Sequence, residues 1–320
     1  MSAKLNIVNT FENSTKKPIV FLVLIGLTGL FLRLIYFPYD VPLMMDSQGY
    51  FWYAIDMSIL NQLPSGHSIV NTGWPSFLSI IFQLMDSNNF LDYHNMQRFV
   101  GVAFSVATIF PVYLLCSIYF KKSYSLLGAA LFVFEPRLIQ NSFMGTAESM
   151  YIFLMALLLF LFLSNNFKKI YLAFGVVALL ALVRYEGLLM IIPISIIFFI
   201  RFRKQKRDLI KYIICISIFI LILAPSAYFK TETMGSAMNA FSHISAGLEY
   251  YQNQLWNEKY NLPGIEVLEP GDLIKINSSA LAGFLYLGSI NLIKFLGWAL
   301  IPSFIIFVPL GIIFIFQKLD

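Results

Sequence analysis

An acidic residue, Asp46, stands just beyond the first apolar run of the chain. It opens a short segment rich in aromatic side chains: Tyr50, Phe51, Trp52 and Tyr53. A carboxylate in this place can meet a substrate held at a membrane surface, and Tyr50 is a further candidate for substrate binding. The alternative is that Asp46 only caps a helix beginning near Gln48, because aspartate is a preferred capping residue.

A second acidic residue, Glu148, stands at the start of a later apolar run, in the segment Gly145–Ser149. Facing Asp46, it would bind sugar hydroxyls or, together with Asp46, a divalent cation such as Mg²⁺ or Mn²⁺. The alternative is that Glu148 is simply an acid placed favourably at a helix N-terminus.

Two arginines lie close to further acids, in the segments Glu135–Arg137 and Arg184–Glu186. A guanidinium group makes bidentate contacts with phosphate and stays charged. We therefore assign Arg184 to phosphate binding and leave the role of Arg137 open, with Glu135 and Glu186 as further candidates for substrate binding. The alternative is internal pairing of each arginine with its neighbouring acid. Because positions i and i+2 do not share a helix face, such a pair is expected to cross between helices.

Other chemistries find no support in the sequence. There is no Walker A motif, no glycine-rich dinucleotide fingerprint and no histidine spacing suited to zinc. The substrate must therefore arrive already activated, and we expect no nucleic acid partner.

The composition predicts a membrane protein. The 320 residues are 58% hydrophobic and 12% charged, with a mean hydropathy of +0.75, and apolar runs of about 20 residues recur along the chain. The predicted fold is an all-α polytopic membrane protein with about eight transmembrane helices. The spans are expected at 18–37, 99–119, 124–141, 148–164, 169–184, 187–200, 210–229 and 294–316.

These spans divide the chain into regions. A cytoplasmic N-terminus (1–17) precedes a transmembrane core (18–229), whose first external loop (38–98) contains amphipathic helices over Tyr50–Leu60 and Pro75–Met85. A second external loop (230–283) and an interfacial segment with the last span (284–320) follow.

Charge fixes the expected orientation. With the N-terminus inside, 14 of the 22 Lys and Arg residues fall on the cytoplasmic side, as the positive-inside rule requires. Both termini are then cytoplasmic, in the plasma membrane if the cell is prokaryotic. The ionisable residues within spans all lie toward the outer ends, namely Arg33, Arg98, Glu135, Arg137, Glu148, Arg184, Glu186 and Lys294. Two short spans place the clusters at 135–137 and 184–186 below the outer surface, which predicts one outward-facing cavity with Asp46 across its mouth.

The order of these short motifs resembles the GT-C glycosyltransferases, in particular the protein O-mannosyltransferases and the aminoarabinose transferases. The resemblance covers residues 18 to 200 and is carried by Asp46–Tyr50, Gly73–Phe77, Glu135-Pro136, Thr146–Ser149 and Leu182–Gly187. It implies an inverting transfer of a sugar from a polyprenyl or dolichyl phosphate to a protein, lipid or glycan acceptor.

The resemblance also implies individual roles. Asp46 would be the catalytic base, Glu148 would bind metal or substrate, and Arg184 would hold the phosphate. One departure is that the mannosyltransferases follow their aspartate with glutamate, where this chain has Ser47. The alternative functions are a transporter or lipid flippase and a non-catalytic subunit of a glycan-assembly complex.

Overall fold

The computed structural model describes residues 16–64, 71–164, 166–202, 208–234 and 289–290. The chain divides into two compact units, Met1–Ala237 and Met238–Asp320, and the helices described below all belong to the first. This described part is helical and contains no strand. The helices are α2 (Lys16–Ile35), α3 (Asp46–Leu60), α4 (Gly73–Phe82), α5 (Phe90–Ala107), α6 (Ile109–Tyr119), α7 (Lys122–Val133), α8 (Pro136–Ser142), α9 (Glu148–Leu163), α10 (Phe167–Val183), α11 (Glu186–Leu189), α12 (Ile191–Phe202) and α13 (Asp208–Met234).

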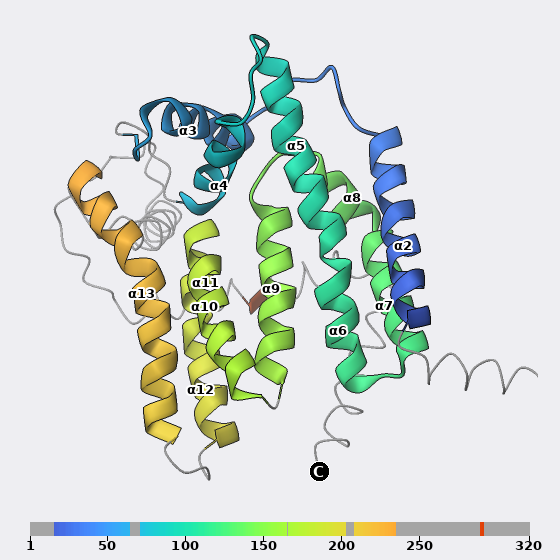
Figure 1. Ribbon diagram of the computed structural model, residues 1–320, viewed down its shortest axis with the longest axis vertical. Helices are drawn as coiled ribbons and strands as arrows, with labels where there is room; N and C mark the ends of the chain where they lie inside the picture. The colour runs from blue at the N-terminus through green and yellow to red at the C-terminus, as the bar shows by residue number, and fades with distance from the viewer. Residues whose placement is uncertain (1–15, 65–70, 165, 203–207, 235–288, 291–320) are drawn as a thin grey trace, which may run out of the picture. The chain divides into compact units, whose positions relative to one another are not determined.

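The long helices run side by side, and α3 lies across one end of them (Figure 1). The closest helix pairs include α9 with α10, α10 with α13, and α6 with α7. We call the end that carries α3 and α4 the α3 end. The turns between α6 and α7 and between α9 and α10 lie at the opposite end (Figure 1).

Three helical segments are long and apolar enough to cross a membrane: Lys17–Ile35, Phe90–Tyr119 and Asp208–Phe229. They correspond to the predicted spans at 18–37, 99–119 and 210–229, and confirm the prediction of a helical membrane protein. The predicted span at 294–316 and the predicted loop at 230–283 fall largely or wholly outside the described residues.

Three predicted spans have different limits in the structure. The one expected at 187–200 divides into α11 and α12. The one expected at 99–119 begins at Phe90 instead, because polar residues of the first turns of α5 are used to bind neighbouring loops. The one expected at 124–141 divides into α7 and α8. Pro136 stands at the start of α8 and cannot continue α7, since proline lacks the backbone N–H.

The two predicted amphipathic helices are present as α3 and α4. Each packs on the bundle through buried side chains spaced three or four residues apart. Among these side chains are Phe51 and Ala54 of α3 and Trp74, Leu78 and Phe82 of α4. Burial of a side chain of this size contributes about 1.5–3 kcal/mol. This packing fixes α3, and therefore Asp46 at its first residue, over the end of the bundle.

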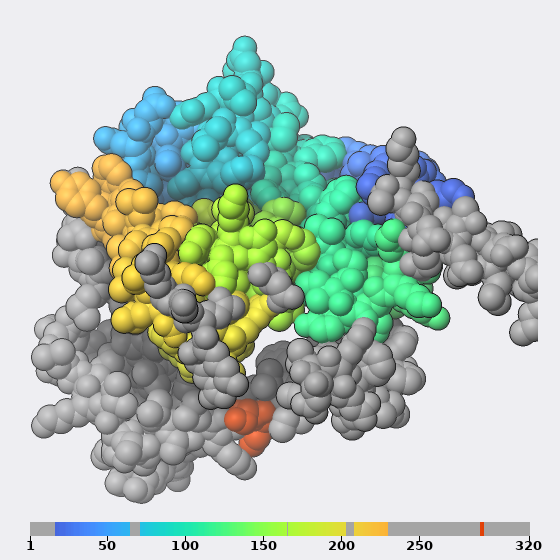
Figure 2. Space-filling view, turned by 60° about the horizontal axis from the view of Figure 1, so that its bottom comes forward, coloured from blue at the N-terminus to red at the C-terminus, as the bar shows by residue number. Residues whose placement is uncertain are grey.

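Figure 2 turns the opposite end of the bundle toward the viewer. Basic residues lie at the turns of this end: Lys121 and Lys122 between α6 and α7, Lys168 and Lys169 at the start of α10, and Arg201 at the end of α12. Arg201 donates to the carbonyl groups of Phe162, Leu163 and Ser164, which end α9. A cation there complements the negative end of the helix dipole. We propose that this end faces the cytoplasm, in line with the positive-inside rule.

Labelling of the two ends of α5–α6 tests this orientation. In a variant lacking Cys116 and Cys215, a cysteine at Asn88 should react with an impermeant thiol reagent added to sealed cells, and one at Lys121 should not. Both positions are exposed in the structure, and one apolar helix pair separates them. Labelling of position 121 in intact cells, with position 88 protected, would reverse the orientation.

Candidate active site

Asp46 is the first residue of α3. The residue at the capping position is Met45, and no side chain caps the helix, so the capping role considered for Asp46 is not what the structure shows. The Asp46 carboxylate is exposed and makes no hydrogen bond within the described residues. Met45 has a φ of 55°, which is uncommon for a residue with a side chain. Strain of this kind persists only where the surroundings hold it in place.

Side chains on one face of α5 bind the segment on either side of Met45. His94, Gln97 and Arg98 are spaced i, i+3 and i+4, so all three point to the same side of the helix. The Nδ1 atom of His94 accepts from the backbone N–H of Leu43 at 3.4 Å, and Nη2 of Arg98 donates to the carbonyl oxygen of Pro42 at 2.9 Å. Nε2 of Gln97 donates to the carbonyl oxygen of Ser47, also at 2.9 Å.

The same face of α5 binds the loop that leads to Glu148. Nε2 of Gln97 also donates to the carbonyl oxygen of Gly145 at 2.6 Å, and Nε of Arg98 donates to that of Phe143 at 3.0 Å. Gly145 has a φ of 70°, a backbone conformation that favours glycine. Trp74 of α4 donates its indole N–H to the same Gly145 carbonyl. The loops that carry the two acids are therefore joined through two side chains of α5.

Asp46 and Glu148 line one cavity. Its volume is about 650 Å³. The other lining residues are Pro38, Val41, Pro42, Met44, Met45, Ser47, Arg98, Asn141, Phe143, Met144 and Thr146. The lining combines an apolar wall with charged groups of both signs, which suits an amphiphilic substrate.

Arg184 binds two acids. Its Nη1 forms an ion pair with Oε1 of Glu148, and its Nη2 lies 2.8 Å from Oε1 of Glu186. Hydrogen bonding to Glu186 raises the pKa of Arg184, and the charge of Glu148 acts in the same direction while burial opposes both. With two carboxylates around one guanidinium, the cluster has a formal charge of −1 and offers little attraction to a phosphate. These contacts do not support the phosphate role implied for Arg184.

The pairing of Arg184 with Glu186 also corrects an expectation about geometry. Such a pair was expected to cross between helices, but Arg184 has an extended backbone after α10 and Glu186 begins α11. The helical rule against i, i+2 pairs does not apply to a residue between two helices.

Tyr50 lies one turn after Asp46 on α3. Burial raises the pKa of its hydroxyl, the side chain of Asn71 lowers it by hydrogen bonding, and the charges of Glu148 and Asp46 raise it further while Arg184 lowers it. Tyr50 is thus close enough to respond to both carboxylates of the cavity and to Arg184.

The remaining predicted site residues lie elsewhere. Glu135 caps α8, because its Oε2 accepts from the backbone N–H of Leu138 at 2.7 Å. Arg137 is exposed on α8. Neither residue lines the cavity that contains Asp46. Arg184 and Glu186 do not line it either, and Arg184 is connected to it by its ion pair with Glu148.

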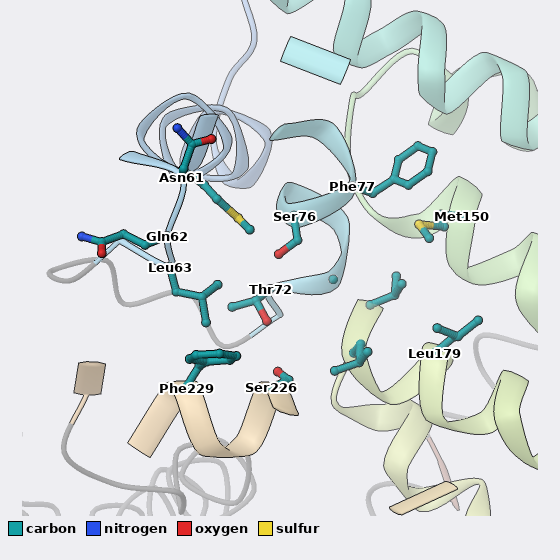
Figure 3. Close-up of a pocket in the computed structure, with 14 residues that line it drawn as sticks. Asn61, Gln62, Leu63, Thr72, Ser76, Phe77, Met150, Leu179, Ser226 and Phe229 are labelled. Atoms are coloured by element: carbon teal, nitrogen blue, oxygen red, sulfur yellow. The ribbon is translucent and has the colours of Figure 1, made fainter. Parts of the chain in front are cut away.

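A second cavity, of about 550 Å³, lies between the end of α3, α4, α10 and α13 (Figure 3). Phe77 of α4, Met150 of α9, Leu179 of α10 and Phe229 of α13 are among its lining side chains. None of the described residues that line it is ionisable, so these residues offer no group suited to proton transfer. The chemistry is therefore expected in the cavity with Asp46.

The donor set does not match a divalent cation well. Within the described residues no three of the usual ligand side chains come together. Asp46 and Glu148 are two carboxylates, and Oε1 of Glu148 is already bound by Arg184. Mg²⁺ or Mn²⁺ needs more oxygen ligands than these two groups supply directly, and no step below uses a metal.

Residues 75–229 match the family described as dolichyl-phosphate-mannose-protein mannosyltransferase. This places the matched region in a GT-C glycosyltransferase family. None of the curated proteins matches the chain.

The GT-C match confirms the resemblance seen in the sequence. It includes Glu148, Arg184 and the face of α5 that binds both loops, and it begins after Asp46. The matched region is therefore mannosyltransferase-like, and its apolar helices are typical of a membrane protein.

Gln97, Asn71 and Trp74 also position the candidate site, and no role was predicted for them from the sequence. Asn71 Oδ1 accepts from the backbone N–H of Tyr185 at 2.9 Å and so fixes the segment beside Arg184. The available signal was the polar stripe His94, Gln97, Arg98 followed by Gly101 at helical spacing. Gly101 allows α5 to approach the carbonyl oxygen of Ser142, since a Cβ there would lie 2.9 Å from it.

Gly187 tests the packing beside Arg184. A Cβ at this position would lie 2.4 Å from the carbonyl carbon of Leu180, and backbone cannot move aside cheaply. We expect Gly187→Ala to destabilise the protein by about 1–3 kcal/mol, measured as a lower unfolding temperature in detergent.

The matched control is Gly175→Ala in α10, where a Cβ would meet only Ile222 and Ile218 side chains at 3.4 Å and 3.6 Å. This change should be neutral or slightly stabilising, because alanine is the better helix former. A Gly187→Ala variant as stable as Gly175→Ala would show that Gly187 does not lie against the backbone of α10.

Proposed function

We propose that this protein transfers a sugar from a polyprenyl or dolichyl phosphate to a hydroxyl-bearing acceptor, with inversion at the anomeric carbon. The observation that supports this most is that Asp46, exposed and without a hydrogen bond in the described part of the chain, lines one cavity with Glu148. The match to the mannosyltransferase family supports the reaction class.

In the proposed reaction Asp46 acts as the base. The acceptor oxygen attacks the anomeric carbon, and its proton passes to the Asp46 carboxylate. As the new carbon–oxygen bond forms, the bond between that carbon and the phosphate oxygen breaks, and the phosphate keeps the electron pair. The leaving group needs no proton because the phosphate is a stable anion. Attack from the opposite face inverts the configuration.

Glu148 is proposed to bind the sugar. Its Oε1 is fixed by Arg184, whereas its Oε2 is buried and has no hydrogen-bond partner in the described structure. An unpaired buried acceptor is costly. A sugar hydroxyl that donates to Oε2 would remove that cost and orient the ring. In this proposal Arg184, which is also bound to Glu186, fixes the position of Glu148.

Replacement of Asp46 by asparagine tests the base. Asp46→Asn keeps the shape of the side chain but cannot accept the proton. Turnover should fall by roughly 10²–10⁴-fold, measured as transfer of radiolabelled sugar from a polyprenyl-phosphate donor in membranes with the native acceptor present. Asp56→Asn, later on the same helix, is the control and should remain active. Near-normal transfer by Asp46→Asn at equal protein levels would remove Asp46 from the mechanism.

A pair of glutamates tests the sugar contact. Glu148→Gln should raise the KM for the donor sugar and lower kcat, because it replaces one carboxylate oxygen by an NH2 group, which donates, and removes the charge that pairs with Arg184. Glu135→Gln changes the cap of α8 outside the cavity and should leave both constants close to wild type. Unchanged kinetics for Glu148→Gln would contradict the proposed sugar contact.

A further inference from the structure

Arg98 is a buried cation in the cavity of Asp46 and Glu148. Its exposed fraction is 3%, yet it lines the cavity. Its three nitrogen atoms donate to Phe143 and Pro42 carbonyl oxygens and to Oδ1 of Asn95. All of these acceptors are neutral. No carboxylate pairs with Arg98 in the part of the chain that the structure describes.

A buried charge without a counter-ion is costly, and carbonyl groups compensate only part of that cost. The guanidinium group has five N–H donors, of which three are used here. Arg98 therefore keeps both the charge and the donors needed to bind an anion. Arg184, in contrast, is already surrounded by Glu148 and Glu186.

We propose that Arg98, rather than Arg184, binds the anionic group of the substrate in this cavity. The inference rests on the proposed function and names the group that meets the phosphate. A negatively charged phosphate at Arg98 would leave the sugar within reach of the two carboxylates. The apolar lining, with Val41, Met44 and Met144, would accommodate the isoprenoid chain. Phosphate on the lipid donor and an anionic group on the acceptor share this chemistry.

Arg33 supplies a matched control. It is fully buried and also donates to neutral groups, the carbonyl oxygens of Gly29 and Val133 and the hydroxyl of Ser105. It does not line the cavity. Replacement of either arginine should lower the stability of the protein, because both are buried. Only replacement of Arg98 should also weaken anion binding.

The test measures binding of farnesyl phosphate, farnesol and inorganic phosphate to the full chain in nanodiscs by calorimetry. The wild-type protein should bind farnesyl phosphate roughly tenfold or more tightly than farnesol, because a charge-assisted contact is worth at least that factor. Arg98→Gln should abolish this preference, Arg98→Lys should retain most of it, and Arg33→Gln should retain it even if the unfolding temperature falls.

Two results would overturn the assignment. One is an unchanged preference for farnesyl phosphate in Arg98→Gln. The other is equal loss in Arg98→Lys and Arg98→Gln, since that would show that bridging the two loops matters and the charge does not. Binding of inorganic phosphate as tight as that of farnesyl phosphate would assign the site to an acceptor anion, and much weaker binding would assign it to the lipid donor.

The test of anion binding at Arg98 can succeed or fail independently of the test of Asp46 as the base. Asp46→Asn should bind farnesyl phosphate at least as tightly as the wild-type protein, because a nearby negative charge is removed. If Asp46→Asn transfers sugar normally while Arg98→Gln loses the phosphate preference, the base assignment fails and the anion site stands.

Discussion

The site depends on one buried amide. Nε2 of Gln97 donates to the carbonyl oxygens of Ser47 and Gly145, one in the segment of Asp46 and the other in the loop before Glu148. Gln97 is fully buried, so its amide is shielded from water. Each of these two hydrogen bonds contributes about 0.5–1.5 kcal/mol. The two acids lie in one cavity because this interaction makes separation of their loops unfavourable.

The rest of the candidate site extends from that junction. Arg98 adds a second bond to each loop, Trp74 connects α4 to Gly145, and the Arg184 ion pair connects Glu148 to the end of α10. The helices supply depth and rigidity, and the loops between them carry the reactive groups. This division of labour is common where a rigid scaffold positions loop residues.

Several features could be predicted from the sequence. Apolar run lengths gave the membrane class, and the aromatic segment after Asp46 gave α3. The motif order indicated the family that the comparison found over residues 75–229. These features succeed because each is set locally, by residue type within one or two helical turns.

Other features could not be predicted because they depend on contacts between distant segments. The start of α5 at Phe90 follows from polar side chains that bind loops far away in sequence, so hydropathy alone placed it too late. The partners of Arg184 depend on an extended backbone between α10 and α11, which no helical spacing rule describes. Gln97 carries no charge and matches no motif, yet its two hydrogen bonds reach segments 50 and 48 residues away.

The central claim is that Gln97 acts on the chemistry by positioning Asp46. A double-mutant cycle on sugar transfer tests it most directly, using Gln97→Ala, Asp46→Asn and the combined variant at matched protein levels. If Gln97 positions Asp46, Gln97→Ala should lower turnover strongly in the wild-type background and only slightly once Asp46 is already asparagine, since coupled groups are non-additive. Fully additive effects of the two changes would contradict the account.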